Sequence, residues 1–136
     1  MNMIEMIPIG ELMHHPENPR LDLGDLTELT ESIRQNGVMQ NLTVVPSETE
    51  KDRYLVVIGN RRMEAAKAAG LTELPCVVSF MNHKDQIATM LMENMQRADL
   101  TVYEQAQGFQ MMMDLGFMPE EIEKKTGFSE TTVRRR

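Results

Sequence analysis

An apolar run, a glycine, two arginines and an alanine-rich segment follow one another near the middle of the chain, and this order constrains the fold more than any other stretch. Tyr54–Ile58 predicts a buried strand, and Met63–Ala69 predicts a helix. Gly59 allows close approach of a ligand, and the unpaired N–H groups of a helix start favour negative charge. Arg61 and Arg62 add donors suited to phosphate. Taken alone, this pattern is more typical of a solvated helix start than of an anion-binding site. The other segments of the chain are needed to distinguish these two interpretations.

Hydrophobic periodicity predicts an α+β fold, in which a small mixed-sheet unit precedes an all-helical segment. Residues 1–82 are expected to form the first unit, and residues 83–136 the second. The expected strands are Met3–Ile9, Leu42–Val45, Tyr54–Ile58 and Leu74–Phe80, and the expected helices span residues 25–36, 63–69, 84–96, 101–115 and 119–125.

Local residue spacing predicts where several helices begin and end. Asp25 is expected to be an N-cap with Glu28 three residues on, and Thr101 with Glu104 repeats this capping-box spacing. Gly37 predicts the end of the first helix, because glycine readily adopts the left-handed conformation that follows many helices.

The composition excludes several classes of site. The formal charge of −7 argues against nucleic-acid binding by the whole surface and leaves room for a local basic patch. Cys76 is the only cysteine, so an internal disulfide and a multi-cysteine metal site are excluded, and its apolar neighbours predict a buried, inert thiol. The adjacent His14 and His15 are poorly placed to chelate one metal, and we interpret them as loop residues. The fourteen methionines are expected mainly in the core.

The N-terminal residues and the hydropathy predict a cytoplasmic protein. Met1–Ile9 contains the acidic Glu5 and lacks the basic region of a signal peptide. No apolar run approaches the length of a membrane span, so we expect no membrane partner. A single reduced cysteine is consistent with this compartment.

The C-terminal residues predict a helix-turn-helix that reads DNA. Pro119–Lys125 predicts a short helix, Thr126–Phe128 a turn, and Ser129 the N-cap of a second helix. The candidate DNA-binding residues are Ser129, Thr131, Thr132, Arg134 and Arg135. The sequence ends inside this second helix, as expected of a truncated chain.

Four segments in order resemble the ParB family of chromosome- and plasmid-partition proteins. They are the Asn-Pro loop His15–Arg20, the Gly-Val…Gln block Glu31–Leu42, the arginine box within Val57–Ala66, and the Glu-Asn box Glu93–Leu100. The resemblance covers nearly the whole chain. It implies a ParB/sulfiredoxin-like fold with a pocket for CTP and Mg²⁺, followed by the helix-turn-helix.

The resemblance also assigns roles to individual residues. The arginine box and the Glu-Asn box would hold the triphosphate and the metal, while the Asn-Pro loop and the Gly-Val…Gln block would line the cytidine side. Glu93 and Asn94 are oxygen ligands of the kind that Mg²⁺ takes alongside phosphate oxygens and water. The expected nucleotide-binding residues are Arg20, Gln40, Thr43, Gly59, Asn60, Arg61, Arg62, Glu93, Asn94, Gln96 and Arg97.

Two residues depart from the family pattern. Asn60 stands where the arginine box usually has a glutamate that is linked with nucleotide turnover, and an amide cannot act as a general base. We therefore expect CTP to be bound and hydrolysed slowly or not at all, so that the chain is at most a weak CTPase. Asn41 replaces the proline that usually follows Gln40, which leaves the base selectivity open.

The function expected from the resemblance is a CTP-switched dimeric DNA clamp associated with the nucleoid. Its partners would be a specific double-stranded DNA site, a second copy closing on nucleotide, and in the family often a ParA-type ATPase. Met1–Glu5 shows no basic arginine-bearing peptide of the kind that contacts such an ATPase.

Two alternative functions remain open at this point. The first is a ParB-fold transcriptional or plasmid regulator that has lost nucleotide binding. The second is an ATP-using enzyme on the same scaffold, either sulfiredoxin-like or an amino-acid kinase. Sulfiredoxin chemistry needs a cysteine beside the arginine, where this chain has Asn60, and a kinase would leave the helix-turn-helix without a role.

Overall fold

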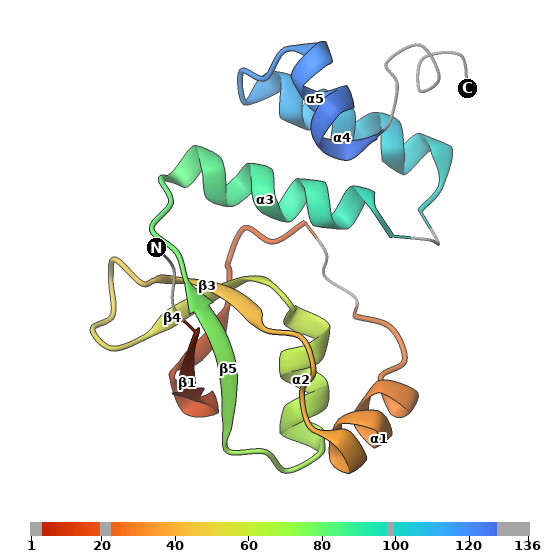
Figure 1. Cartoon of the computed structure of the whole chain (residues 1–136). Coiled ribbons are helices and arrows are strands. Elements are labelled where there is room, and N and C mark those ends of the chain that lie inside the picture. The colour runs from red at the N-terminus through yellow and green to blue at the C-terminus, as the bar shows by residue number, and fades with distance from the viewer. Residues whose placement is uncertain (1–3, 20–22, 98–99, 128–136) are drawn as a thin grey trace. The chain divides into compact units, whose positions relative to one another are not determined.

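The chain divides into two compact units, Met1–Met81 and Asn82–Arg136, which we call the first and the second unit. The computed structural model describes residues 4–19, 23–97 and 100–127. The first unit combines strands with two α-helices, and the described part of the second contains helices alone (Figure 1). The α+β fold class expected from the sequence is confirmed. Within the described ranges, no helix has the length and apolar character needed to cross a membrane.

The first unit is built on a five-stranded mixed sheet. Its strands are β1 (Ile4–Pro8), β2 (Leu12–His14), β3 (Leu42–Pro46), β4 (Tyr54–Ile58) and β5 (Glu73–Val78), in the order β1-β5-β3-β4-β2. β3 pairs antiparallel with β4 and parallel with β5. The edge strand β1 pairs antiparallel with β5, and the edge strand β2 pairs parallel with β4.

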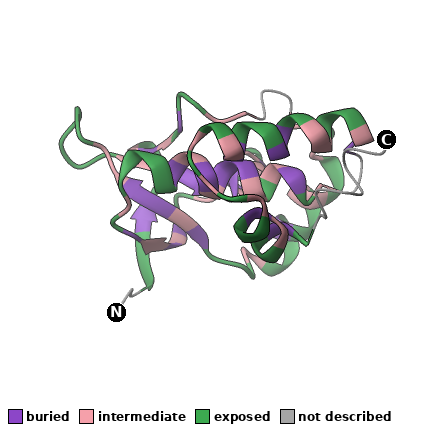
Figure 2. Ribbon diagram, turned by 90° about the horizontal axis from the view of Figure 1, so that it is seen from above, coloured by how far each residue is buried: buried purple, intermediate pink, exposed green. Residues whose placement is uncertain are grey.

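The core of the first unit forms between this sheet and two helices, α1 (Thr27–Asn36) and α2 (Asn60–Ala68). Buried residues gather on the central strands, purple in Figure 2, and α2 buries Asn60, Met63, Ala65 and Ala66. The fully or almost fully buried members are Ile7, Leu12, Ile33, Leu42, Val44, Val56, Met63, Ala65, Ala66, Leu74 and Cys76. The small alanine side chains allow the backbone of α2 to lie close to the strands, so its N-terminus is held firmly at the end of β4.

Two local expectations about this unit are wrong. β2 was not expected, and His14 is its last residue instead of a loop residue, whereas His15 does lie outside regular structure. The N-cap of α1 is Leu26, not Asp25. Asp25 instead accepts hydrogen bonds from the backbone N–H and the hydroxyl of Thr27, at 2.9 and 2.6 Å, and these bonds lower the pKa of its carboxyl. The helix therefore starts after a turn that Asp25 stabilises.

The second unit contains α3 (His83–Met95), α4 (Val102–Asp114) and α5 (Pro119–Thr126). The expected capping box of Thr101 and Glu104 is confirmed at the start of α4. α5 ends at Gly127, which has a left-handed backbone with φ of +80°. The second helix of the expected helix-turn-helix lies outside the described residues.

Methionines contribute to the core of the second unit, although the expectation that most of the chain's methionines are buried is wrong: Met6, Met39, Met111 and Met118 are exposed. Met95 on α3 and Met112 on α4 are buried beside Phe109 and Ile122. Gly108 lets α4 approach α3 closely, because a Cβ atom there would lie 2.7 Å from Cγ of Met95.

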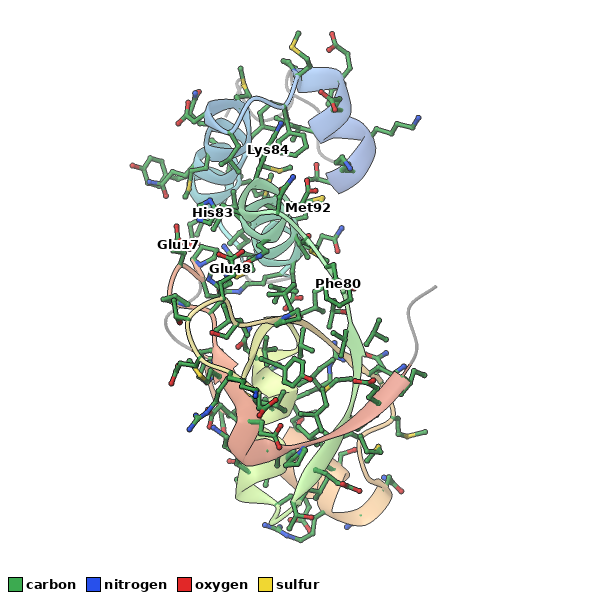
Figure 3. All side chains as sticks on the ribbon, turned by 90° about the vertical axis from the view of Figure 1, so that its left-hand side faces the viewer. Glu17, Glu48, Phe80, His83, Lys84 and Met92 are labelled. Carbon is green, nitrogen blue, oxygen red and sulfur yellow. The ribbon has the colours of Figure 1, made fainter. Side chains whose placement is uncertain are left out.

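Two cation–π contacts also connect α3 and α5 to Phe117, which lies in the connection between α4 and α5. Lys84 at the start of α3, labelled in Figure 3, places Nζ 4.6 Å from the ring centroid of Phe117. Nζ of Lys125 on α5 lies 5.9 Å from the same centroid. Both ammonium groups are therefore within the distance at which a ring attracts a cation.

Candidate functional site

Gly59 connects β4 to α2 and is the residue that shapes the start of the helix. Its backbone is left-handed, with φ of +105°, and it is the N-cap of α2. A Cβ atom at this position would lie 2.8 Å from Cγ of Leu42, which is fully buried on β3. Only glycine meets both conditions, so the start of α2 lies against the beginning of β3.

The two arginines of the box bind backbone carbonyls of neighbouring loops. Arg61 donates from Nε to the carbonyl of Leu23 at 2.9 Å and from Nη2 to that of Asp25 at 3.0 Å. Arg62 donates from Nη1 to the carbonyls of Gln40 and Asn41, at 3.2 and 2.6 Å. The box thereby fixes the loop before α1 and the segment before β3, which the sequence alone did not indicate.

Asn60 is buried, with 5% of its surface exposed, and its side chain is held on both sides. Its Nδ2 donates to the carbonyl of Val56 at 3.4 Å, and its Oδ1 accepts from Nδ1 of His14 at 2.6 Å. The other ring nitrogen of His14 lies 2.6 Å from Oε1 of Glu64, one helical turn after Asn60. His14 is therefore a member of the site that the sequence interpretation missed.

Glu64 is a charged carboxylate in this cluster. Burial raises the pKa of its carboxyl, but the hydrogen bond from His14 and the charge of Lys67 together lower it below its ordinary value. Nζ of Lys67 lies 3.4 Å from the same Oε1 that faces His14. The ionised form of Glu64 is thus stabilised by partners from β2 and from α2 itself.

The base-side candidates Gln40 and Thr43 lie near the box in the first unit. Thr43 is half-buried and pairs with Ile58, the residue before Gly59. The side chain of Gln40 is exposed, and its carbonyl is bound by Arg62. Arg20 lies outside the described residues.

The candidates of the Glu-Asn box belong to the second unit, at the end of α3. Glu93 is exposed and Asn94 is half-buried in the last turn, and Gln96 is the C-cap. Arg97 donates from Nη1 to Oδ1 of Asn94 at 3.2 Å. Glu93 and Asn94 together offer two oxygen-bearing side chains, the number that Mg²⁺ ordinarily takes from a protein when phosphate is present. Across residues 4–19, 23–97 and 100–127, no three His, Cys, Asp or Glu side chains are grouped closely enough to hold a metal ion.

The candidate DNA-binding residues are Ser129, Thr131, Thr132, Arg134 and Arg135, and all five lie outside the described residues. What the structure describes next to them is α5 and the left-handed Gly127 that ends it. The second helix of the helix-turn-helix expected from the sequence therefore stays a prediction.

The model of the ParB N-terminal domain family matches residues 1–95, which is more than half of the chain. The chain belongs to this family. It is also 36% identical over 129 residues to the chromosome-partitioning protein Spo0J of Thermus thermophilus. That match covers 93% of this chain and 47% of the relative, so the chain spans about half the length of the relative.

Two solved structures of ParB from Caulobacter crescentus, both C-terminally truncated, are similar to this ParB-family chain. The one complexed to the centromeric parS site is 30% identical with a TM-score of 0.82, and the match covers 96% of this chain and 68% of that one. The one complexed with CTP-gamma-S is 34% identical with a TM-score of 0.65, covering 96% and 74%.

The fold is also similar to that of sulfiredoxin from Arabidopsis thaliana. The match has 24% identity and a TM-score of 0.50, and it covers 65% of this chain and 97% of that one, so it bears on the fold alone.

Cys76 is fully buried on β5, as expected, and donates from Sγ to the carbonyl of Leu74. Burial, with a contribution from the charge of Glu5, raises the pKa of this thiol to about 11. A thiol of this kind is protonated at neutral pH and is a poor nucleophile.

Proposed function

We propose that this ParB-family chain is the CTP-binding and DNA-binding part of a chromosome- or plasmid-partition protein. The observation that carries the proposal is the arginine box at the start of α2, in a chain similar to a ParB that was crystallised with CTP-gamma-S. The first turn of α2, all of it described, has neither an acidic residue nor a side-chain cap. Its backbone N–H groups are therefore available to an anion.

The donors of the box fit a triphosphate. Among the described residues, Arg62 donates only through Nη1, so its Nε and Nη2 are available to phosphate oxygens. Arg61 likewise retains Nη1. Glu93 and Asn94 would hold Mg²⁺, which neutralises negative charge on the phosphates when it is bound. Gln96 and Arg97 would add phosphate contacts, and Gln40, Thr43 and Arg20 would serve the cytidine side.

The DNA-binding part of the proposal rests on α5 and the helix expected after it. A relative bound to parS supports this role, and a basic patch at Arg134 and Arg135 would be local within an acidic chain. Two copies would close on DNA as a clamp when nucleotide binds. Such a switch requires that the closed state bind CTP more tightly than the open state.

Calorimetric titration tests the proposed function directly. With Mg²⁺ present, we expect CTP to bind at least about tenfold more tightly than ATP, GTP or UTP, which corresponds to about 1.4 kcal/mol. A preference for ATP would support an enzyme on this scaffold instead. If none of the four nucleotides binds, the chain is a ParB-fold DNA regulator without a nucleotide switch.

We further propose that Asn60 makes hydrolysis slow, because the amide cannot activate water. Phosphate release from CTP on a duplex carrying parS should be slow in the native protein and faster in Asn60→Glu. Asn60→Gln is the matched control, since it has the length of glutamate without its charge and should not raise the rate. If Asn60→Glu hydrolyses CTP no faster than the native protein, the proposal that Asn60 slows hydrolysis is wrong. Both variants lose or shift the bond to the Val56 carbonyl, so their folding is checked by circular dichroism.

A further inference from the structure

His14 forms two short hydrogen bonds whose partner atoms only accept. Nδ1 faces Oδ1 of Asn60 and Nε2 faces Oε1 of Glu64, each at 2.6 Å. The orientation of the Asn60 amide is set by its other end, because Nδ2 donates to the carbonyl of Val56. Rotating the amide by 180° would turn its oxygen towards that carbonyl and lose the bond.

The two bonds specify the protonation state of the ring. A neutral imidazole carries one N–H group, whereas an imidazolium carries two. Since an amide oxygen and a carboxylate both lack a proton to give, both bonds exist together only when His14 is an imidazolium. His15 differs, because its Nδ1 accepts from the backbone N–H of Glu17 at 3.0 Å and so carries no proton.

The groups around His14 favour a cation. From α2, Oε1 of Glu64 lies 2.6 Å from the ring, while Nζ of Lys67 lies farther away, 3.4 Å from the same oxygen. From β4, which pairs with β2, the opposite residues are Tyr54, Leu55 and Val56, none of which is an acid or a basic side chain of the Lys, Arg or His type. Asn60 adds no negative charge to the cluster, unlike the glutamate usual at this place in the arginine box.

We propose that His14 is a positioning residue of the nucleotide site: as an imidazolium it ties the end of β2 to the first two turns of α2, where the arginine box lies. The inference rests on the proposed function, because the site that it positions is the proposed CTP site. The loop His15–Pro19, which follows β2, is thereby anchored to the arginine box. Nucleotide affinity then depends on the proton that gives this ring its positive charge.

The test compares His14→Gln with the native protein and with His83→Gln, which changes an exposed histidine of the second unit. CTP affinity is measured with Mg²⁺ at pH 6 and pH 8. We expect the native affinity to fall about tenfold more between these values than that of His14→Gln, the effect of one charge-assisted hydrogen bond. The ionisation of CTP itself contributes equally to all three proteins, so the difference between the profiles is the readout. His83→Gln should follow the native profile.

Ring ¹⁵N NMR of the ligand-free protein tests the cation independently of nucleotide. Both ring nitrogens of His14 should be protonated at pH 6, and Glu64→Gln, which keeps an acceptor but removes the charge, should lower the protonated fraction at pH 7. A neutral His14 ring at pH 6, or parallel affinity profiles for His14→Gln and the native protein, would overturn the proposal. Should the native protein bind no CTP at any pH, the proposed function fails and the positioning role with it, while the ¹⁵N signals still report whether the imidazolium exists.

Discussion

Gly59→Ala is expected to lower the free energy of unfolding of the first unit by about 3 kcal/mol. An alanine with a left-handed backbone costs about 1–2 kcal/mol. The new methyl group would also lie 2.8 Å from Cγ of the fully buried Leu42, and over-packing of this kind adds about 1–3 kcal/mol. The start of α2 and the beginning of β3 would have to separate, which displaces the arginine box as well.

Two other glycines of the same unit distinguish the backbone strain at Gly59 from its contact with Leu42. Gly70 has φ of +86°, but a Cβ atom there would have no neighbouring atom within 4 Å, so Gly70→Ala carries the backbone strain without the clash. Gly10 has neither feature, and Gly10→Ala should be close to neutral. Urea unfolding, followed through the NMR amide signals of β4, reports the first unit separately. A Gly59→Ala variant no less stable than Gly70→Ala would show that the contact with Leu42 does not constrain this turn.

Arg62→Ala is expected to weaken CTP binding about 100-fold. Loss of a charge-assisted, two-donor contact to phosphate costs about 2–3 kcal/mol, and about 2.7 kcal/mol corresponds to two decades in affinity. The variant also frees the carbonyls of Gln40 and Asn41, so the segment before β3 loses its anchor. Both effects act on the proposed site, one through the phosphates and one through the cytidine side.

Arg53→Ala is the matched control, because Arg53 is exposed in the connection between β3 and β4. Arg62→Lys separates charge from geometry, since lysine keeps the charge and loses the planar fork. We expect calorimetry to give native affinity for Arg53→Ala and an intermediate value for Arg62→Lys. If Arg62→Ala binds CTP as tightly as Arg53→Ala, the arginine is a structural clamp of the loops and not a phosphate ligand.

The predictable parts of the fold are those specified by residues close together in sequence. The apolar run before Gly59, the alanines after it and the capping box at Thr101 each act within a few residues, and all were found in the expected places. β2 was missed because a three-residue strand has no recognisable period, and it is stabilised by parallel pairing with β4, about 40 residues away in sequence. Asp25 was assigned the wrong capping role because Thr27 competes for its carboxylate.

The sequence by itself determined the family, the α+β class and the position of Gly59–Arg62 at a helix start. The tertiary structure alone decided what these residues contact. His14 reaches Asn60 and Glu64 across 46 and 50 residues of chain, and Arg62 reaches Gln40 across 22. Such pairs depend on the register of β2 against β4 and on the packing of α2 against the sheet. Both are set by burial of the whole core, which no local spacing encodes.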